Sequence, residues 1–192
     1  LWISRMLKQW GHEVLMASPR KLRLIYENDG KNDQADAEYL ARVARLDPKL
    51  LAPVEPRDQH TQMVLAALRS RDVLVRARTK LANHVRGTVK AMGARVPAMS
   101  SEAFGRKAVA SIPEELWAAL KPVMDAIQTM TEQIARYDRM VERAAEDQYP
   151  ETDRLRKVTG VGALTSLAFV VTLRDPKRFR TSRMVGPYLG LC

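Results

Sequence analysis

Two long stretches with helical spacing of apolar residues dominate the pattern along the chain. The first runs from Arg57 to about Arg95 without a proline and predicts one long helix. The second ends near Gln148, and its apolar residues alternate in steps of four and three over four heptads. The two apolar seams consist of Val64, Ala67, Leu74, Leu81, Val85 and Met92 in the first stretch, and of Leu116, Leu120, Val123, Ile127, Met130, Ile134, Tyr137, Val141 and Ala144 in the second.

The connection between these two helices, residues 98–113, is short and leaves room for one short helix that begins at Ser101. Long helices with such a connection are expected to pack as an antiparallel hairpin, or coiled coil. A seam of this length can be covered within one chain or by a second copy. The pattern therefore leaves an intramolecular bundle and a homo-oligomer as alternatives.

Shorter elements alternate in the first 50 residues. We expect a helix over residues 2–10, a short apolar strand over 12–17, and a helix that begins at Pro19 and runs to Glu27. Helix, strand and helix in so few residues are typical of an α/β layer, and the partners of a single strand would have to come from sequence that precedes this chain.

Two aspartates, Asp33 and Asp36, stand three residues apart at the start of a further helix, which is expected to run to about Leu46. Both carboxylates should project from one face, as a pair of hard oxygen ligands for Mg²⁺ would. The alternative is structural: Asp33 caps the helix and Asp36 favours the positive end of its dipole. On spacing alone the cap is the commoner arrangement. The face expected to be buried consists of Ala37, Leu40, Ala41 and Ala44.

Charge is unevenly distributed over the chain, whose 32 Lys and Arg and 22 Asp and Glu leave a net charge of +10. Residues 57–95 hold nine bases and two acids, residues 96–150 hold six and nine, and residues 151–192 hold eight and three. Two basic segments therefore flank an acidic one, which favours directed contacts with phosphate. The candidates for such contacts on the first long helix are Arg69, Arg76, Arg78, Lys80, Arg86 and Lys90.

A Gly-Val-Gly turn at Gly160 and Gly162 separates two short helical patterns after Pro150. Backbone N–H groups at such a turn can hold a phosphate oxygen with no side chain in the way. With the bases around it, the turn predicts a helix-hairpin-helix contact with a nucleic-acid backbone; the alternative is a tight interhelical turn with solvated charges. The basic candidates here are Lys157, Lys177, Arg178 and Arg180.

Three blocks, in this order, resemble the DEDD-type insertion-sequence transposases of the IS110 group. They are KNDQADAEYLA near the start, RSRDVLVRARTKLANHVRG on the long basic helix, and VTGVGALTSLAFVVTLRDPKRFRTSRMVGPYLGL at the end. The resemblance implies an N-terminal RuvC-like domain that holds Mg²⁺ with four acids, a coiled coil, and a C-terminal domain whose serine attacks DNA. It also implies that a structured bridge RNA guides the choice of DNA sites.

The resemblance carries over to individual residues only in part. By position, Asp33 and Asp36 match the last two of the four acids, and the first two would lie upstream of this chain. The nucleophilic serine would follow Cys192, and neither Ser166 nor Ser182 takes its place. The chain is therefore expected to be an inactive fragment of a transposase that acts in the prokaryotic cytoplasm.

The expected organisation follows from these patterns and from the resemblance. The fold class is mainly α, with a remnant of an α/β domain. The expected parts are a partial RuvC-like domain over residues 1–50, a proline-rich linker over 51–56, the helical hairpin over 57–148, and the start of the C-terminal domain over 149–192.

Two other classes of function were weighed against the transposase. A non-catalytic nucleic-acid-binding and oligomerisation module would use the basic helix and the glycine turn, and its aspartates would only cap. A basic protein of the membrane surface fits poorly because the bases alternate with a core-forming seam. No apolar run approaches the length of a membrane span, and the single cysteine, Cys192, excludes an intrachain disulfide framework.

Overall fold

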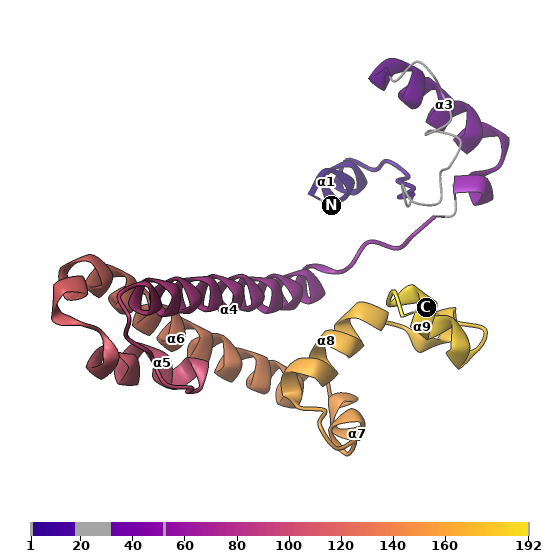
Figure 1. Ribbon diagram of the computed structural model, residues 1–192. Coiled ribbons are helices and arrows are strands. Elements are labelled where there is room, and N and C mark those ends of the chain that lie inside the picture. Colours follow the sequence, from indigo (N-terminus) through magenta and orange to yellow (C-terminus); the bar gives the residue numbers. More distant parts are fainter. Residues whose placement is uncertain (1, 18–31, 52, 192) are drawn as a thin grey trace. The chain divides into compact units, whose positions relative to one another are not determined.

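The computed structural model describes residues 2–17, 32–51 and 53–191 of the chain (Figure 1). This part of the chain is mainly helical and contains no β-sheet, which confirms the predicted fold class. It divides into two compact units, residues 1–58 and residues 59–192. The helix expected over residues 19–27 lies outside the described residues. None of the described helices combines the length and the apolar composition that a membrane span needs.

The first unit contains α1 (Trp2–Gln9), α3 (Asp33–Leu46) and the 3₁₀ turn η2 (Pro48–Leu51). No residue of α3 is buried, so the expected buried face is wrong in part. Ala37 and Ala41 are exposed, and the half-buried stripe runs instead through residues that include Asp36, Leu40 and Val43.

The strand expected over residues 12–17 is reduced to one antiparallel bridge, between Ala17 and Pro53. Beside it, the Val54 N–H donates to the Met16 carbonyl over 2.7 Å. A strand is stabilised by a ladder of such bonds with its neighbours. The described residues of this unit form no further β-bridge, so the apolar run does not become part of a sheet.

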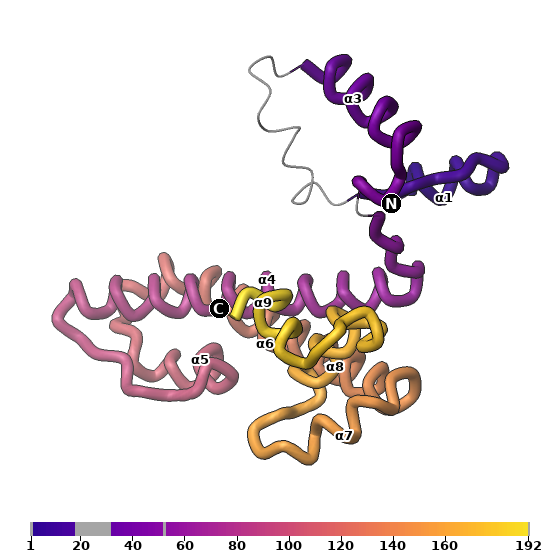
Figure 2. The backbone as a smooth tube through the Cα atoms, turned by 90° about the vertical axis from the view of Figure 1, so that its right-hand side faces the viewer, coloured from indigo at the N-terminus to yellow at the C-terminus, as the bar shows by residue number. Residues whose placement is uncertain are grey.

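The second unit is built on two long helices, α4 (Gln59–Ala91) and α6 (Glu114–Gln148), which pack side by side and antiparallel (Figures 1 and 2). A short helix, α5 (Ser101–Lys107), lies in the connection as expected, followed by the 3₁₀ turn η3 (Ala108–Ser111), and packs against both. α6 continues through Pro122 without a break.

The core lies in two clusters along this pair of helices. Near the connection, late residues of α4 meet early residues of α6 and the ring of α5: Ala82, Val85, Val89, Phe104, Leu120, Met124 and Ile127. At the opposite end, late residues of α6 meet α8 and early residues of α4: Val141, Ala144, Ala145, Leu167 and Val171, with Val64, Leu65 and Leu68 packed against them.

The predicted seam of α6 is confirmed, because all nine of its residues are buried or half-buried. The predicted seam of α4 is wrong at its end, where Met92 is 56% exposed. α4 stops at Ala91, and the chain reverses at Gly93 with φ +80, a left-handed conformation that glycine adopts without strain. Met92 is therefore no longer on the helix face that packs against α6.

The rest of the second unit is made of short helices that follow α6. They are α7 (Thr152–Arg156), α8 (Ala163–Leu173), the 3₁₀ turns η4 (Pro176–Arg178) and η5 (Ser182–Met184), and α9 (Val185–Tyr188). α8 packs against both α4 and α6, and its Leu167 is fully buried between them.

Arg78 lies inside the second unit, which corrects its prediction as a contact to nucleic acid. Its side chain is only 5% exposed, and Nη2 lies 3.3 Å from Oε1 of Glu102 on α5. Position 78 falls on the α4 face that continues through the buried Ala82 and Val85, so its stem is part of the seam. The guanidinium holds α5 to α4, and it is not available to a phosphate.

The contact between α5 and α6 generates the first prediction. A Cβ added at Gly105 would lie 3.2 Å from the backbone N and Cα of Gln128, so Gly105→Ala forces the two helices apart. We expect this change to lower the free energy of unfolding by about 1–3 kcal/mol in chemical denaturation. Gly87→Ala is the control, because Gly87 lies within α4 with open space around it and should gain about 0.5–1 kcal/mol. Equal effects of both changes would contradict close packing at Gly105.

The ion pair between Arg78 and Glu102 generates a second prediction, on pH. The pKa of Glu102 is lowered from its ordinary 4.5, first by a hydrogen bond with its own backbone N–H, then by the Ser100 hydroxyl and by Arg78. Because the folded-state pKa lies below the unfolded one, the charged form stabilises the fold above about pH 4.5, and this contribution is lost as the pH falls through the folded-state pKa. Glu102→Gln should therefore flatten the fall in melting temperature below pH 4.5.

The control for this measurement is Glu115→Gln, which removes the same charge from an exposed position on α6. It should change the slope of melting temperature against pH less than Glu102→Gln does, because the described residues give Glu115 no ion-pair partner. If Glu102→Gln and Glu115→Gln change the slope equally, the charge of Glu102 has no specific part in holding α5.

Candidate functional site

The two aspartates predicted as metal ligands occupy the first turn of α3, and a neighbouring residue caps this helix. Asn32 has the extended conformation of an N-cap, with φ −140 and ψ 125, and its Oδ1 accepts a hydrogen bond from the Gln34 N–H at 2.9 Å. Asp33 is the first helical residue, so the alternative in which Asp33 caps the helix is wrong. The Asp36 N–H donates to the Asn32 carbonyl and closes the first turn.

Both carboxylates lie near the positive end of the α3 dipole, where negative charge is favoured. Asp33 is exposed and Asp36 is half-buried. Within the described ranges, neither side chain has an ion-pair or hydrogen-bond partner, and no three residues of His, Cys, Asp and Glu gather closely enough to hold a metal ion. Two carboxylates on one turn fit the hard oxygen donors of Mg²⁺, but they supply only part of an octahedral shell.

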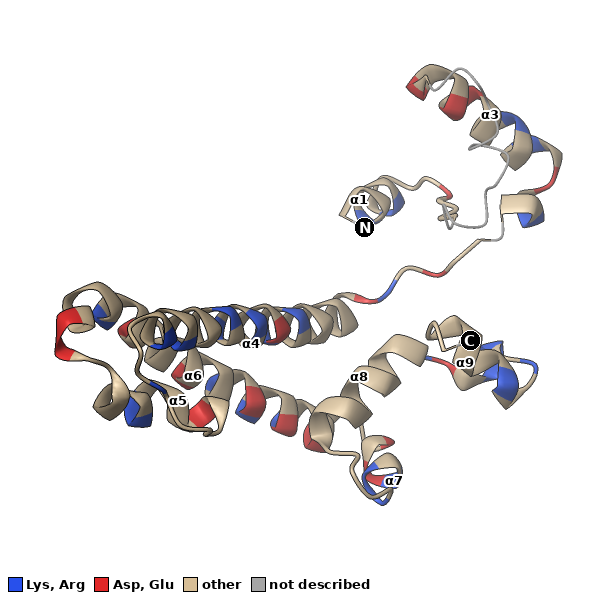
Figure 3. Cartoon of the chain, in the orientation of Figure 1, with Lys and Arg blue, Asp and Glu red and all other residues tan. Residues whose placement is uncertain are grey.

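The exposed bases of α4 form a stripe opposite the seam, which we call the outer stripe: Arg69, Arg76, Lys80 and Lys90. Their positions along the helix place them on the side away from α6, and Figure 3 shows basic residues recurring along α4. Asp72 is the one acid in α4, and it pairs with Arg76 at 2.9 Å. An exposed pair of this kind is weak, so the stripe keeps its positive character.

Arg86 lies at the edge of this stripe and is held by an aromatic ring. Its guanidinium carbon lies 4.7 Å from the centre of the Phe104 ring, and the side chain is half-buried. One face of the guanidinium is thus covered by the ring, a cation–π arrangement that fixes its orientation. Its Nη1 also donates to Oδ1 of Asn83 over 3.4 Å, and Arg86 stays a predicted contact.

The glycine turn before α8 has the backbone that the sequence pattern requires. Gly160 has φ +87, and Gly162 is the extended N-cap of α8 with no side-chain cap. A Cβ at Gly162 would meet nothing within 4 Å, so the space beside Gly162 at the start of α8 is open. Lys157 is exposed beside the turn. Its contact with a nucleic-acid backbone remains a prediction.

The position of this turn is fixed by ion pairs to α6. Arg156 of α7 contacts the Glu142 carboxylate at 2.6 Å and the Glu146 carboxylate at 3.7 Å. Ser166 is buried, and its hydroxyl donates to the Gly162 carbonyl over 3.0 Å. The Ser166 hydroxyl is thus used within α8.

The three C-terminal bases differ in their contacts with neighbouring side chains. Lys177 and Arg180 are exposed. The Arg178 guanidinium lies over two rings, 4.4 Å from the centre of Tyr188 and 4.9 Å from that of Phe179. Arg178 is exposed as well, so it packs on these rings and, like Lys177 and Arg180, stays a predicted contact.

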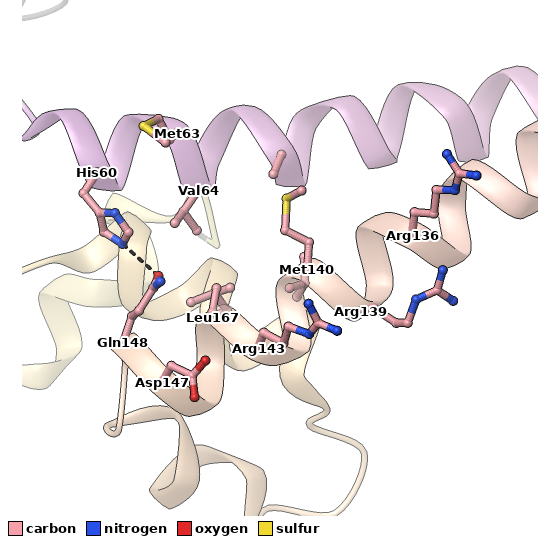
Figure 4. Close-up of a pocket in the computed structure, with 13 residues that line it drawn as sticks. His60, Met63, Val64, Arg136, Arg139, Met140, Arg143, Asp147, Gln148 and Leu167 are labelled. Carbon is pink, nitrogen blue, oxygen red and sulfur yellow. Dashed lines mark hydrogen bonds between the residues drawn. The ribbon is translucent and has the colours of Figure 1, made fainter.

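Three arginines that the sequence patterns did not single out line a groove between α4 and α6 (Figure 4). They are Arg136, Arg139 and Arg143. The excess of acids in residues 96–150 conceals them, because charge summed over a segment does not distinguish the faces of a helix. Their spacing of three and four residues within an amphipathic helix was the signal that could have found them.

The cap of α3 generates a prediction that separates structure from function. Asn32→Ala should lower the opening free energy of α3 by about 1 kcal/mol, measured by amide hydrogen exchange, because it removes the bond to the Gln34 N–H. Asp33→Asn should have the smaller effect, a few tenths of a kcal/mol to about 1, because it only weakens an interaction with the dipole. If Asp33→Asn lowered the opening free energy of α3 more than Asn32→Ala does, Asp33 and not Asn32 would cap the helix.

Comparison with known proteins matches both ends of the chain to transposases. The sequence profile of IS110 DEDD-type proteins, described as "Transposase", covers residues 1–93, and the profile described as "Transposase IS116/IS110/IS902 family" covers residues 152–192. No solved structure matches the chain.

Curated relatives align with nearly the whole chain. It is 30% identical to a "Probable family 20 transposase" of Pseudomonas aeruginosa, over 98% of this chain and 56% of that protein. It is 29% identical to the transposase for insertion sequence element IS1328 of Yersinia enterocolitica, over 99% of this chain and 57% of that protein. It is 28% identical to the transposase for insertion sequence element IS1111A of Coxiella burnetii, over 94% of this chain and 50% of that protein. The chain spans about half the length of these relatives. Because both profiles and all these relatives agree, the chain belongs to the IS110 family of DEDD-type transposases.

Proposed function

We propose that this chain forms part of a DNA transposase that carries out Mg²⁺-dependent strand exchange. The observation that carries the proposal is the start of α3, where Asn32 provides the cap and leaves the carboxylates of Asp33 and Asp36 without a structural partner among the described residues. Two such carboxylates on one turn suit a shared cation. Membership of a DEDD-type family supports the same role.

In this proposal Asp33 and Asp36 supply two oxygen ligands, and the other ligands come from acids that this chain does not contribute. A bound Mg²⁺ would stabilise the charge that develops on the transferring phosphate. The helix orients the two carboxylates, since both belong to its first turn and Asp36 is held on the half-buried side. With only half of the ligands, the chain alone should not catalyse strand exchange.

The partners we propose are DNA and a structured guide RNA, in the cytoplasm of a prokaryotic cell. The outer stripe, Arg86 and the turn at Gly160 and Gly162 would contact phosphates without reading sequence, which is the part that basic side chains and open backbone N–H groups play. Lys157, Lys177 and Arg180 would extend this surface. A homo-oligomer formed through the long helices completes the proposal, because a heptad seam also suits a second copy.

The alternative function is a nucleic-acid-binding and assembly module without catalysis. It is favoured by one observation, the exposed outer stripe, which needs no metal to bind phosphate. Under this alternative Asp33 and Asp36 contribute only through the helix dipole.

The test uses the intact transposase from which this chain derives, in a strand-exchange assay with Mg²⁺. Asp33→Asn combined with Asp36→Asn should reduce the rate by more than the roughly 100-fold that loss of an outer-shell partner costs at a metal site. Glu38→Gln is the matched control, because it removes an acid from the same helix, where Glu38 pairs with Arg42. Full activity of the double variant would contradict the metal-binding role of Asp33 and Asp36 and would favour the alternative in which they act only through the helix dipole.

A further inference from the structure

A groove with a volume of about 550 Å³ lies between the first half of α4 and the second half of α6, beside the point where α8 packs on both. Its floor is apolar and includes Val64, Ala67 and Leu167. Two methionines at its mouth, Met63 and Met140, are 61% and 55% exposed (Figure 4). Such exposure of two flexible apolar side chains beside a groove is typical of a surface that a partner covers.

Arg136, Arg139 and Arg143 line the same groove from one face of α6. They follow each other at intervals of three and four residues and extend over about 10 Å of helix. All three are exposed, and they have no ion-pair or hydrogen-bond partner within the part of the chain that the structure describes. Asp147 is the one acid that lines the groove. The groove therefore has an excess of positive charge.

Three further acids of α6 near these arginines are already paired with other bases. Asp138 binds Arg71 of α4, and Glu142 and Glu146 bind Arg156 of α7. Like charges at these intervals destabilise a helix, and Glu132, four residues before Arg136, and Asp147, four residues after Arg143, offset only part of the repulsion among three arginines. An anionic partner would relieve it.

We propose that this groove binds the sugar–phosphate backbone of a single nucleic-acid strand. The inference rests on the proposed function and adds to it a contact separate from the outer stripe. Guanidinium groups match phosphate oxygens in pairs, and a strand placed along α6 would bring its phosphates to the arginines. Its sugars and base edges would then cover the methionines and the apolar floor.

A single strand fits this groove better than a duplex does. The groove is concave and lies between two packed helices, so it admits one narrow chain, whereas the outer stripe lies on an open, convex helix face that a duplex can approach. Proteins that bind single strands combine a basic groove with apolar platforms for the bases. The platform here is methionine and aliphatic rather than aromatic, which predicts weak discrimination among bases.

The experiment compares two variants of the whole chain that lose the same charge. Arg136, Arg139 and Arg143 are changed to Gln in the groove variant; Arg69, Arg76 and Lys80 are changed to Gln in the stripe variant. The probes are a labelled poly(dT) oligonucleotide and a DNA duplex of equal length, each titrated over a range of salt. If the three groove arginines each contact a phosphate, the slope of log K against log salt for poly(dT) should fall by about 2 in the groove variant, with little change for the duplex.

A second change tests the groove by blocking it with charge. Met140→Glu places an anion at the exposed mouth and should weaken poly(dT) binding while duplex binding and the unfolding midpoint stay unchanged. All six changed bases and Met140 are exposed, so these variants should fold as the unmodified chain does.

The outcomes separate this proposal from the proposed function. If the groove variant keeps the poly(dT) slope and the stripe variant loses duplex binding, the groove proposal is overturned and nucleic-acid binding stands. If the folded, unmodified chain binds neither probe, the groove proposal and the proposed phosphate contacts of the outer stripe both fail, and the strand-exchange assay still tests the proposed function. If the groove variant changes its sedimentation coefficient with unchanged poly(dT) binding, the groove is filled by a second copy instead, and the proposal is overturned.

Discussion

The apolar seam between α4 and α6 is the constraint on which the second unit depends. Side chains such as Val85, Val89 and Ile127 are fully buried in it, and each contributes about 1.5–3 kcal/mol on burial. The seam fixes the rotation of α4, and this rotation decides which bases point outward. The outer stripe is therefore a consequence of the same heptad register that builds the core, and changes in the seam would also move the proposed contacts.

The charges of the hairpin follow from this register. Acids on α6 that face a neighbouring helix hold it: Asp138 binds Arg71 of α4, and Glu142 binds Arg156 of α7. Arg78 points inward and holds α5 through Glu102. The outer stripe and the groove keep an excess of bases, because Asp72 pairs with Arg76 alone and Asp147 is the one acid that lines the groove. Ion pairs thus position the short helices, and the unpaired bases are left for phosphate.

The sequence predicted the parts of this fold that rest on apolar periodicity. All nine seam residues of α6 were found because each step of three or four keeps the same face inward. The buried position of Arg78 is not predicted, because a charged residue is normally assigned to the surface, although its long aliphatic stem can fill a position in the seam. The apolar run that ends at Ala17 predicts a strand, but it does not reveal whether a neighbouring strand is present, and the structure has a single bridge there. The groove arginines were hidden because residues 96–150 hold nine acids and only six bases, which makes the segment read as acidic.

The start of α3 shows why local spacing alone could not decide the role of the aspartates. Asn32 and Asp33 are both good capping residues, and the backbone of Asn32 settles which of them caps. Once Asn32 holds the Gln34 N–H, the structural need for an acid at Asp33 and Asp36 is reduced to the helix dipole, which many other residues would tolerate. Structural and chemical roles are then divided between adjacent residues: Asn32 starts the helix, and the two carboxylates in its first turn are left for the metal that we propose.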